Sequence, residues 1–319
     1  MAYGRSGHLA LHFQNSFGTL LTTSAHYLPL VTESVMETIG QVVESGIYGR
    51  LAESPVHEGL HEVAGEIHTE AHPIALGHFL KAALGQVTTT PQNSAFLHDF
   101  RPAATDWDAL AALPPMTLEI HRDVGSAFLY GNLLADALSL EISQGQLLSA
   151  SLSVKGGLFS RKAPAAAVFP AGRPWTWDVA SAAYNGQAVT ELRQLSVRFE
   201  NQLALAHTLD GGRWPSRVKR GGPQRVAVQG AMVFQDQALF SDFLAQTERP
   251  LSLSLAGETV AGSYTNQLTL HVPKLRFTEF KPALSGPGLL EVSFSAKGVF
   301  DPGLGYALRA TLVNTQPGY

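Results

Sequence analysis

Five histidines fall within 22 positions in the first half of the chain, where their spacing could support metal chemistry: His57, His61, His68, His72 and His78. The pairs at 57/61 and 68/72 have the i, i+4 spacing that places two imidazoles on one face of a helix for zinc binding. Residues 62–71, however, alternate between apolar and polar types as in a strand, and Pro73 follows His72. The pattern therefore favours solvated or interface histidines, and no metal or other cofactor is expected.

Acid-base chemistry is the second possibility that the residue types allow. The carboxylates that could form a catalytic pair are Glu62, Glu66, Glu70, Asp99, Asp106 and Asp108. No fixed spacing relates them, and the chain has no G-x-S-x-G elbow, no phosphate-binding glycine loop and no dinucleotide fingerprint. The sequence therefore does not favour an enzyme, and a β-rich hydrolase is kept only as a third alternative.

The densest run of charge is basic and lies between two glycine pairs, in residues 211–222. It contains Arg213, Arg217, Lys219 and Arg220. One interpretation is a solvated turn, and a second is an electrostatic contact with a neighbouring subunit through acidic residues such as Glu44, Glu53 and Glu58. Nucleic-acid binding is a third, but a net charge of −4 argues against a protein that coats phosphate backbones.

Composition indicates a folded protein with little surface charge, since 45% of the residues are apolar and 15% are charged. The chain has no cysteine, which excludes disulfides and thiolate metal or redox sites. The N-terminus lacks the apolar region of a secretory signal, and no run approaches the roughly 18 apolar residues of a membrane span. We therefore expect a soluble protein at synthesis that has no membrane partner.

The elements that must position these residues occur twice. The segment Leu147–Gly156 matches Leu289–Gly298, and the glycine of Gly65-Glu-Ile-His-Thr-Glu-Ala71 matches Gly230. Because 319 residues suit two domains of ordinary size, the repeat predicts a duplicated domain. The expected boundaries are an N-terminal arm at 1–27, a first domain at 28–159, a linker and entry to the second copy at 160–186, and a second domain at 187–319.

Each copy is expected to contain one helix that covers a sheet. In the first copy an apolar stripe precedes Gly85: Leu76, Phe79, Leu80, Ala83 and Leu84. In the second copy Asp236 is a plausible N-cap, and the stripe is Leu239, Phe240, Phe243 and Leu244. Both helices are predicted to lie over the core.

Alternation of apolar and polar residues predicts the strands, which makes the fold mainly β. Expected strands are one in the N-terminal arm and then 28–46, 62–71, 116–123, 134–143, 147–155, 250–256, 266–280 and 289–298. A proline-rich loop is predicted after the first helix, at Pro91, Pro102, Pro114 and Pro115. Residues 40–60 and 202–225 are predicted to be long loops, a type that usually binds something.

Two further groups of residues suggest surfaces rather than chemistry. Ser149, Ser151 and Ser153 share one face of a strand with Ser143 nearby, so they suit either an ordinary solvated face or the inner face of a wide, water-filled barrel. The tryptophans are candidate interface anchors, with half-buried core positions as the alternative: Trp175, Trp177 and Trp214.

The order of several short motifs along nearly the whole chain resembles one known family. These motifs are Asn15-Ser-Phe-Gly-Thr19, His26-Tyr-Leu-Pro29, Gly65-Glu-Ile-His-Thr-Glu70, Lys81-Ala-Ala-Leu-Gly85, Tyr130-Gly131, Gly212-Arg-Trp-Pro215, Phe300-Asp-Pro302 and Leu312-Val-Asn314. The chain resembles the major tail tube proteins of long, flexible-tailed bacteriophages, in the class whose subunit carries two tube domains.

The resemblance implies two tandem domains, each a sandwich-like or barrel-like sheet with one flanking helix. It also implies trimers that form pseudo-hexameric rings, and rings that stack into a conduit for genome delivery. The expected partners are other copies of the chain, a tape-measure protein, a tail terminator and tail-tip proteins, and DNA is expected to pass through without specific binding. The protein would be synthesised and assembled in the host cytoplasm and reside in the virion tail. A carbohydrate-binding or receptor-binding module of a tail tip is the second alternative.

Overall fold

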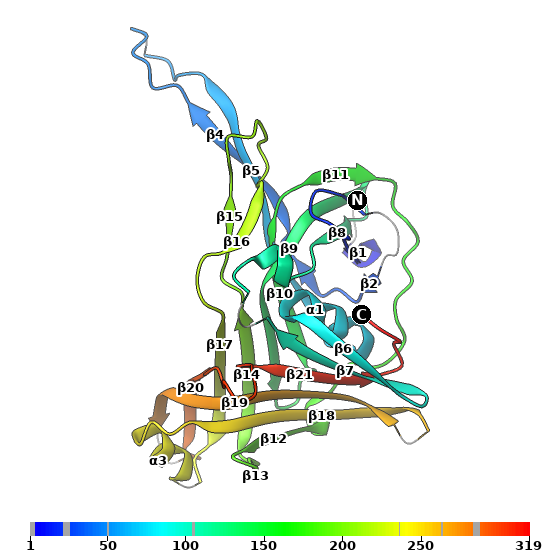
Figure 1. The fold of residues 1–319 in the computed structure, drawn as a ribbon, viewed down its shortest axis with the longest axis vertical. Coiled ribbons are helices and arrows are strands. Elements are labelled where there is room, and N and C mark those ends of the chain that lie inside the picture. The colour runs from blue at the N-terminus through cyan, green and yellow to red at the C-terminus, as the bar shows by residue number, and fades with distance from the viewer. Residues whose placement is uncertain are drawn as a thin grey trace.

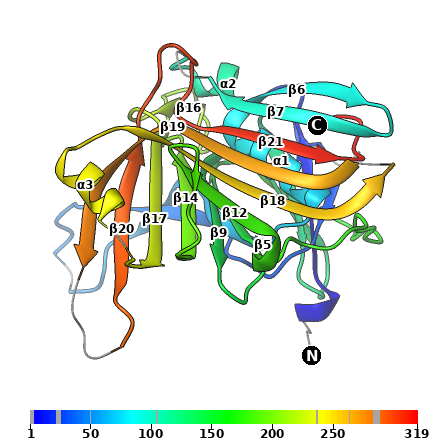
Figure 2. The ribbon, with the colours of Figure 1, turned by 90° about the horizontal axis from the view of Figure 1, so that it is seen from below.

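The computed structural model describes residues 4–21, 26–49, 51–103, 106–235, 237–262, 264–282 and 288–319. The protein is mainly β, as the sequence predicts, and its strands form a 19-stranded sheet and a separate two-stranded sheet. The large sheet folds over to give two layers and is not closed into a barrel. Figures 1 and 2 show this arrangement from two directions.

One layer is a continuous antiparallel sheet that runs through both halves of the chain. Its order is β4 (Met36–Val43), β5 (Val56–Glu70), β10 (Ser149–Gly156), β9 (Ala127–Ser143), β14 (Leu192–Glu200), β17 (Arg225–Val233), β20 (Glu291–Gly298) and the last part of β19 (Tyr264–Pro282). The halves meet where β9 pairs with β14, for example at Leu140 and Val197. Seen from below, β5, β9, β14, β17 and β20 lie in one row (Figure 2).

The second layer also crosses between the halves. Its order is β12 (Ala180–Tyr184), β18 (Arg249–Ala261), the first part of β19, β21 (Arg309–Asn314), β7 (Ala95–Pro102) and β6 (Gly85–Gln92). Strand β19 belongs to both layers, because it pairs with β18 up to Leu275 and with β20 from there onward. The short β13 (Gln187–Ala188) pairs with β12.

The N-terminal strand predicted from Leu9 and Leu11 is confirmed as β1 (His8–Phe13). It lies between β2 (His26–Leu28) and β8 (Met116–His121), and both leucines are fully buried. Strand β8 continues the sheet to β9, which also pairs with β11 (Phe159–Lys162). The remaining short elements are β3 (Thr32–Glu33), the 3-10 turns at Gly4–Ser6 and Trp177–Val179, and α2 (Ala109–Ala112).

Helix α1 (Pro73–Leu84) has the boundaries and the buried stripe that the sequence predicts. Pro73 occupies the first turn, where its missing N–H costs nothing, and Gly85 ends the helix with φ of +83°. The helix lies between the two layers, where it contacts β9, β10, β21, β6 and β7. Its side chains therefore fill the centre of the first half, and Leu76, Phe79, Leu80 and Leu84 are almost completely buried.

The second predicted helix exists, but it is shorter and more exposed than the sequence suggests. Helix α3 (Ala238–Leu244) has seven residues, and none of them is buried. Phe240 and Phe243 pack against Phe280 of β19, but the side chain of Leu244 is 66% exposed. The predicted N-cap, Asp236, lies outside the described residues. The helix therefore covers a rim of the second half instead of filling its core.

The predicted proline-rich loop after α1 is also partly wrong, because residues 85–102 form the hairpin β6–β7. Pro91 lies on β6, which pairs only with β7 within the described residues, and an edge strand tolerates a residue without an N–H donor. Asp108 then caps α2 by accepting a hydrogen bond from the N–H of Leu110.

The two segments predicted as long loops are mostly β-hairpins. Strands β4 and β5 form the projecting hairpin (residues 36–62), which extends beyond one end of the sheet (Figure 1). Strands β15 (Leu203–Ala206) and β16 (Arg217–Arg220) form the bracing hairpin (residues 203–220) beside it. The repeat places these hairpins at equivalent positions of the two copies, since Tyr48-Gly-Arg50 corresponds to Gly211-Gly-Arg213.

We predict unequal costs for truncating the matched aromatic side chains of the two helices. Phe79→Ala removes a side chain that is 1% exposed and should cost about 3–5 kcal/mol of unfolding free energy. Phe243→Ala removes a partly buried side chain and should cost no more than about 2 kcal/mol. Denaturant unfolding measures both, and equal losses would contradict the difference between the helices.

Acidification should destabilise the protein through His78. Burial, followed by the positive charges of His26 and Lys81, holds the pKa of His78 well below its ordinary value. Below about pH 6.5 the His78 imidazole binds a proton in the unfolded chain but stays neutral in the folded protein. The free energy of unfolding therefore falls as the pH drops from there toward the lowered pKa. His78→Phe should flatten the loss of melting temperature between pH 7 and pH 5, whereas His68→Phe, at an exposed position, should not. Identical pH profiles for the parent and His78→Phe would refute this.

Candidate functional site

The continuous sheet has one buried face and one polar face. On β10, Ser149, Ser151 and Ser153 alternate with almost fully buried apolar residues. Cross-strand register places Ser151 opposite His68 of β5 and Ser139 of β9. The same face, called the polar face below, continues through Ser143, Glu141, Ser196, Arg198, Gln229, Ser293 and Ser295. The structure therefore brings the predicted serines together on one surface.

Three basic side chains on the polar face have a carboxylate partner. The Arg198 Nε lies 2.9 Å from Glu200 Oε1, and the Lys155 Nζ lies 2.9 Å from Asp136 Oδ2. At the far strand the Lys281 Nζ lies 2.6 Å from Glu279 Oε1. The hydrogen bond from Arg198 holds the pKa of Glu200 below its ordinary value, so this carboxylate stays ionised. The face is hydrophilic, but register also places the exposed side chains of Arg225 and Lys297 on it, so its positive charge is only partly compensated.

The polar-face sheet has two open edges. Within the described residues, β4 pairs only with β5, and residues 276–282 of β19 pair only with β20. An open edge presents unpaired N–H and C=O groups that can accept another strand. Arg276 forms a hydrogen bond of 3.0 Å to Gln246, which follows α3, so this helix lies near the β19 edge.

The projecting hairpin concentrates exposed apolar side chains. At least half exposed are Met36, Ile39, Val42, Val43, Ile47, Tyr48, Leu51, Val56 and Leu60. Soluble proteins rarely expose so many apolar groups on one element unless the element is an interaction surface. The sequence did not mark these residues as a surface, because Met36 and Ile39 lie in a predicted strand and the others lie in a segment predicted to be a loop.

The bracing hairpin holds the base of the projecting hairpin. The guanidinium of Arg213 forms an ion pair with Glu58, and the N–H of His61 donates to the carbonyl of Arg213 at 2.9 Å. The rings of Trp214 and His61 meet edge to face with centroids 4.9 Å apart. The hydrogen bond from Arg213, followed by that from His61, lowers the pKa of Glu58. The acidic partner predicted for the basic run therefore lies within the same chain.

The four predicted basic residues do not form one cluster. Because β16 is a strand, Arg217 and Lys219 lie on its exposed face and Arg220 lies on the opposite one. The Arg220 Nη1 donates to Asn201 Oδ1 at 2.7 Å, and its Nε donates to the carbonyl of Asp106 at 3.1 Å. Asn201 is itself fully buried. Arg213 and Arg220 thus have structural contacts, and Arg217 and Lys219 are available at the surface.

The three predicted tryptophans also have different positions. Trp175 is 1% exposed, and its Nε1 donates to the carbonyl of Asn266 at 3.4 Å, so it is a core residue of the chain. Trp214 is half-buried against the projecting hairpin. Trp177 is 45% exposed. Trp175 lies between Leu148 and β19. Of the three, Trp177 alone has a large exposed surface.

The candidate acid-base residues are dispersed among structural roles. Asp99 receives hydrogen bonds from Arg101 and Arg309, each at 2.8 Å, and Asp108 caps α2. Glu62 and Glu70 lie on exposed positions of β5, and Glu66 is half-buried on the same strand. Among the residues that the structure describes, no group of three or more histidine, cysteine, aspartate or glutamate side chains is arranged to hold a metal ion.

Sequence reasoning missed one buried charged cluster. Glu119 is fully buried, and the Lys162 Nζ lies 2.6 Å from its Oε2. The Nε2 atoms of His8 and His12 lie 3.6 Å and 3.5 Å from the same carboxylate. The available signal was the pattern of β1, in which His8 and His12 lie on one face and Leu9 and Leu11 on the other. Both faces of this strand are buried. The cluster joins β1, β8 and β11.

The fold and its surfaces define a mainly β protein with open sheet edges and an exposed apolar hairpin. A family model described as phage tail tube protein matches residues 4–298. The chain belongs to this family and is a structural protein of the phage tail. No curated protein matches the chain. No helix within the described ranges is long and apolar enough to span a membrane.

We predict that the two kinds of basic residue on β16 separate in stability measurements. Arg220→Ser removes charged hydrogen bonds to Asn201 and Asp106 and should cost about 1.5–3 kcal/mol. The double substitution Arg217→Ser/Lys219→Ser changes exposed side chains and should stay within about 0.5 kcal/mol of the parent. Urea denaturation tests both, and an Arg220→Ser variant as stable as the parent would contradict the structural role.

Proposed function

We propose that the chain is the repeating subunit of a phage tail tube, in which three copies close a ring and rings stack into a conduit. The observation that carries this proposal is the order of the strands in the polar-face sheet. The first copy contributes β4, β5, β10 and β9, and the second contributes β14, β17, β20 and β19. Equivalent strands of the repeat therefore follow in the same order.

This order supplies a template for the contact between chains. The internal junction joins β9, the last strand of the first copy, to β14, the first strand of the second. The equivalent junction outward would join the last part of β19 to β4 of the next chain, and both of these edges are open. A head-to-tail contact that repeats with rotation closes a ring. Pairing of sheet edges supplies the backbone hydrogen bonds.

Ring closure would place the polar face toward the lumen. The apolar face of the sheet is already covered by α1 and the second layer, which leaves the polar face for water. Large barrels enclose an aqueous channel. Small hydroxyl side chains such as Ser143, Ser149, Ser151 and Ser153 keep much of this face uncharged, and carboxylates beside Lys155 and Arg198 reduce its basic character. A weakly basic wall lets DNA pass, because a strongly basic one would bind its phosphates.

Ring stacking is assigned to the end that carries the two hairpins. The projecting hairpin extends beyond the sheet with exposed apolar side chains, and Arg217 and Lys219 lie exposed on the bracing hairpin beside it. Arg213 and Arg220 support this end through contacts within the chain. The tape-measure, terminator and tip proteins are the further partners in this proposal, and the tube is assembled in the host cytoplasm with no cofactor.

The alternatives have less support. A carbohydrate-binding module favours aromatic platforms gathered in one copy, whereas the exposed aromatic side chains Tyr48, Trp107, Phe169, Trp177 and Phe300 are scattered over both halves. A hydrolase favours a pair of carboxylates in a cleft, whereas the candidate carboxylates cap a helix, bind arginines or lie on β5.

We predict that charge on the β4 edge blocks ring closure without unfolding the chain. Ile39→Lys/Val42→Lys changes two side chains that are more than half exposed, so the melting temperature should stay within a few degrees of the parent. Rings should be lost in native mass spectrometry and negative-stain microscopy. The control is Val124→Lys/Val168→Lys, which changes residues that are at least as exposed and lie outside both hairpins. Rings in the β4 variant, or a parent that stays monomeric at every concentration, would contradict the proposal.

A further inference from the structure

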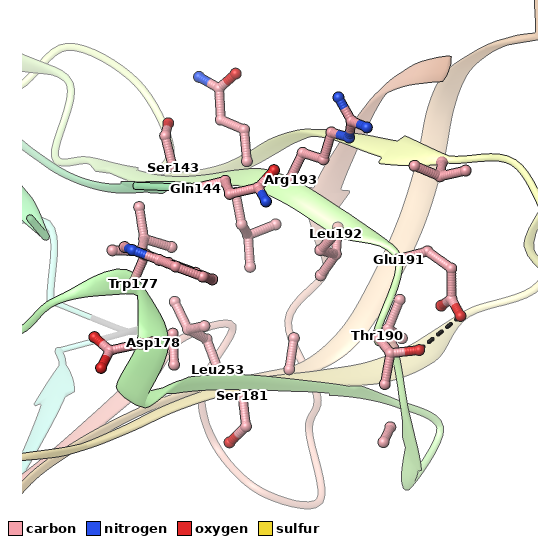
Figure 3. Close-up of a pocket in the computed structure, with 18 of the residues that line it drawn as sticks. Ser143, Gln144, Trp177, Asp178, Ser181, Thr190, Glu191, Leu192, Arg193 and Leu253 are labelled. Atoms are coloured by element: carbon pink, nitrogen blue, oxygen red, sulfur yellow. Dashed lines mark hydrogen bonds between the residues drawn. The ribbon is translucent and has the colours of Figure 1, made fainter. Parts of the chain in front are cut away.

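A pocket of about 540 Å³ lies at the end of the molecule opposite the projecting hairpin. It is formed by the end of β9, the turn before β14, strand β12 and the 3-10 turn that carries Trp177. Figure 3 shows Trp177 on one side of this pocket, with Leu192 and Leu253 facing the same space. Its size is within the range of cavities that hold a ligand or several side chains.

The chemistry of the pocket favours an apolar occupant. Ile142, Leu195 and Leu253 contribute almost buried apolar surface, and Trp177 adds a half-exposed indole. Two polar groups at the rim are already engaged, since the Arg193 Nη1 lies 2.5 Å from Glu291 Oε1 and the Thr190 hydroxyl donates to Glu191 at 2.7 Å. A half-exposed tryptophan above an apolar floor is the usual form of an interface hot spot.

The tip of the projecting hairpin has the complementary character. The side chains of Ile47 and Leu51 are fully exposed, and no other described element exposes two large aliphatic residues so completely within five positions. The tip is supported from within the chain, because the Tyr48 hydroxyl donates to Glu44 and Arg213 holds Glu58 at the base. Support of this kind lowers the entropy cost of docking.

We propose that Ile47 and Leu51 of one subunit insert into the Trp177 pocket of the next subunit along the tube. The occupant is a second copy of this chain, because the tip and the pocket lie at opposite ends of its long axis (Figure 1). A contact between two different surfaces, facing opposite ways, repeats without closing and builds an open filament. This inference rests on the proposed function and adds to it the site that receives the hairpin.

Cysteine cross-linking tests the contact directly, because the chain contains no cysteine of its own. Leu51→Cys places a thiol on the tip, and Ala188→Cys places one at an exposed position of the pocket lining. Oxidation of assembled double variant should give a ladder of covalent multimers on denaturing gels. A mixture of the two single variants should give heterodimers and no larger products, because each chain then carries only one thiol. The matched control pairs Leu51→Cys with Leu244→Cys, an exposed residue of α3 that does not line the pocket.

Substitution tests the same contact by function. Ile47→Ser/Leu51→Ser and, separately, Trp177→Ala should leave ring formation intact and weaken ring-to-ring association by about ten- to a hundredfold, the effect of losing one or two buried side chains. Val168→Ser, at an exposed position outside both hairpins and the pocket, should elongate as the parent does.

The outcomes separate the two proposals. Tubes that form with no ladder from the tip and pocket cysteines, an equal ladder from the α3 control, or tip variants that elongate at the parent rate would each overturn this inference while leaving the tube function standing. A parent protein that forms neither rings nor tubes would overturn both. Ladder formation together with loss of elongation in both the tip and Trp177 variants would support the assigned pocket.

Discussion

The backbone pairing of β9 with β14 is the interaction on which the rest of the structure depends. It joins the two halves of the chain into one sheet, so that side chains from both halves share a single polar face. Period-two alternation then determines which residues face water and which face α1 and the second layer. Because the pairing uses backbone groups, it requires little similarity between the side chains of the two copies. The edges β4 and β19 remain as the places where the same kind of pairing can continue.

The two hairpins lie at positions that the sequence repeat relates, but they make different contacts. In the first copy the hairpin projects and exposes Ile47 and Leu51, whereas in the second copy it folds beside the first and supplies Arg213 and Trp214. An exposed ion pair such as Arg213 with Glu58 contributes little to the free energy of unfolding, because solvent screens it. Its role here is to orient the two hairpins, since the ion pair, the backbone hydrogen bond from His61 and the ring contact all join the bracing hairpin to the base of the projecting hairpin.

Local periodicity accounts for the parts of the fold that the sequence could predict. The stripe from Leu76 to Leu84 and the alternation of β10 and β20 depend on neighbours in the chain, so helix α1 and these strands were predicted correctly. The hairpin β6–β7 was missed because prolines were interpreted without knowing that β6 is an edge. The exposure of α3 and the burial of Trp175 depend on partners about 40 and 90 residues away, such as Phe280 and Asn266, which no local pattern specifies.

The same limit explains the candidate site. A basic run in sequence suggested one charged surface, but the strand β16 divides it, so that Arg220 faces the buried Asn201 while Arg217 and Lys219 face solvent. The polar serines could be predicted because alternation alone places them on one face. The open edges could not be predicted, because an open edge is a strand without a neighbour. Identifying one requires the whole strand order. Strand order also relates the β9–β14 junction within the chain to the β19–β4 contact proposed between chains. The proposed assembly therefore depends on the folded chain more than on any single motif.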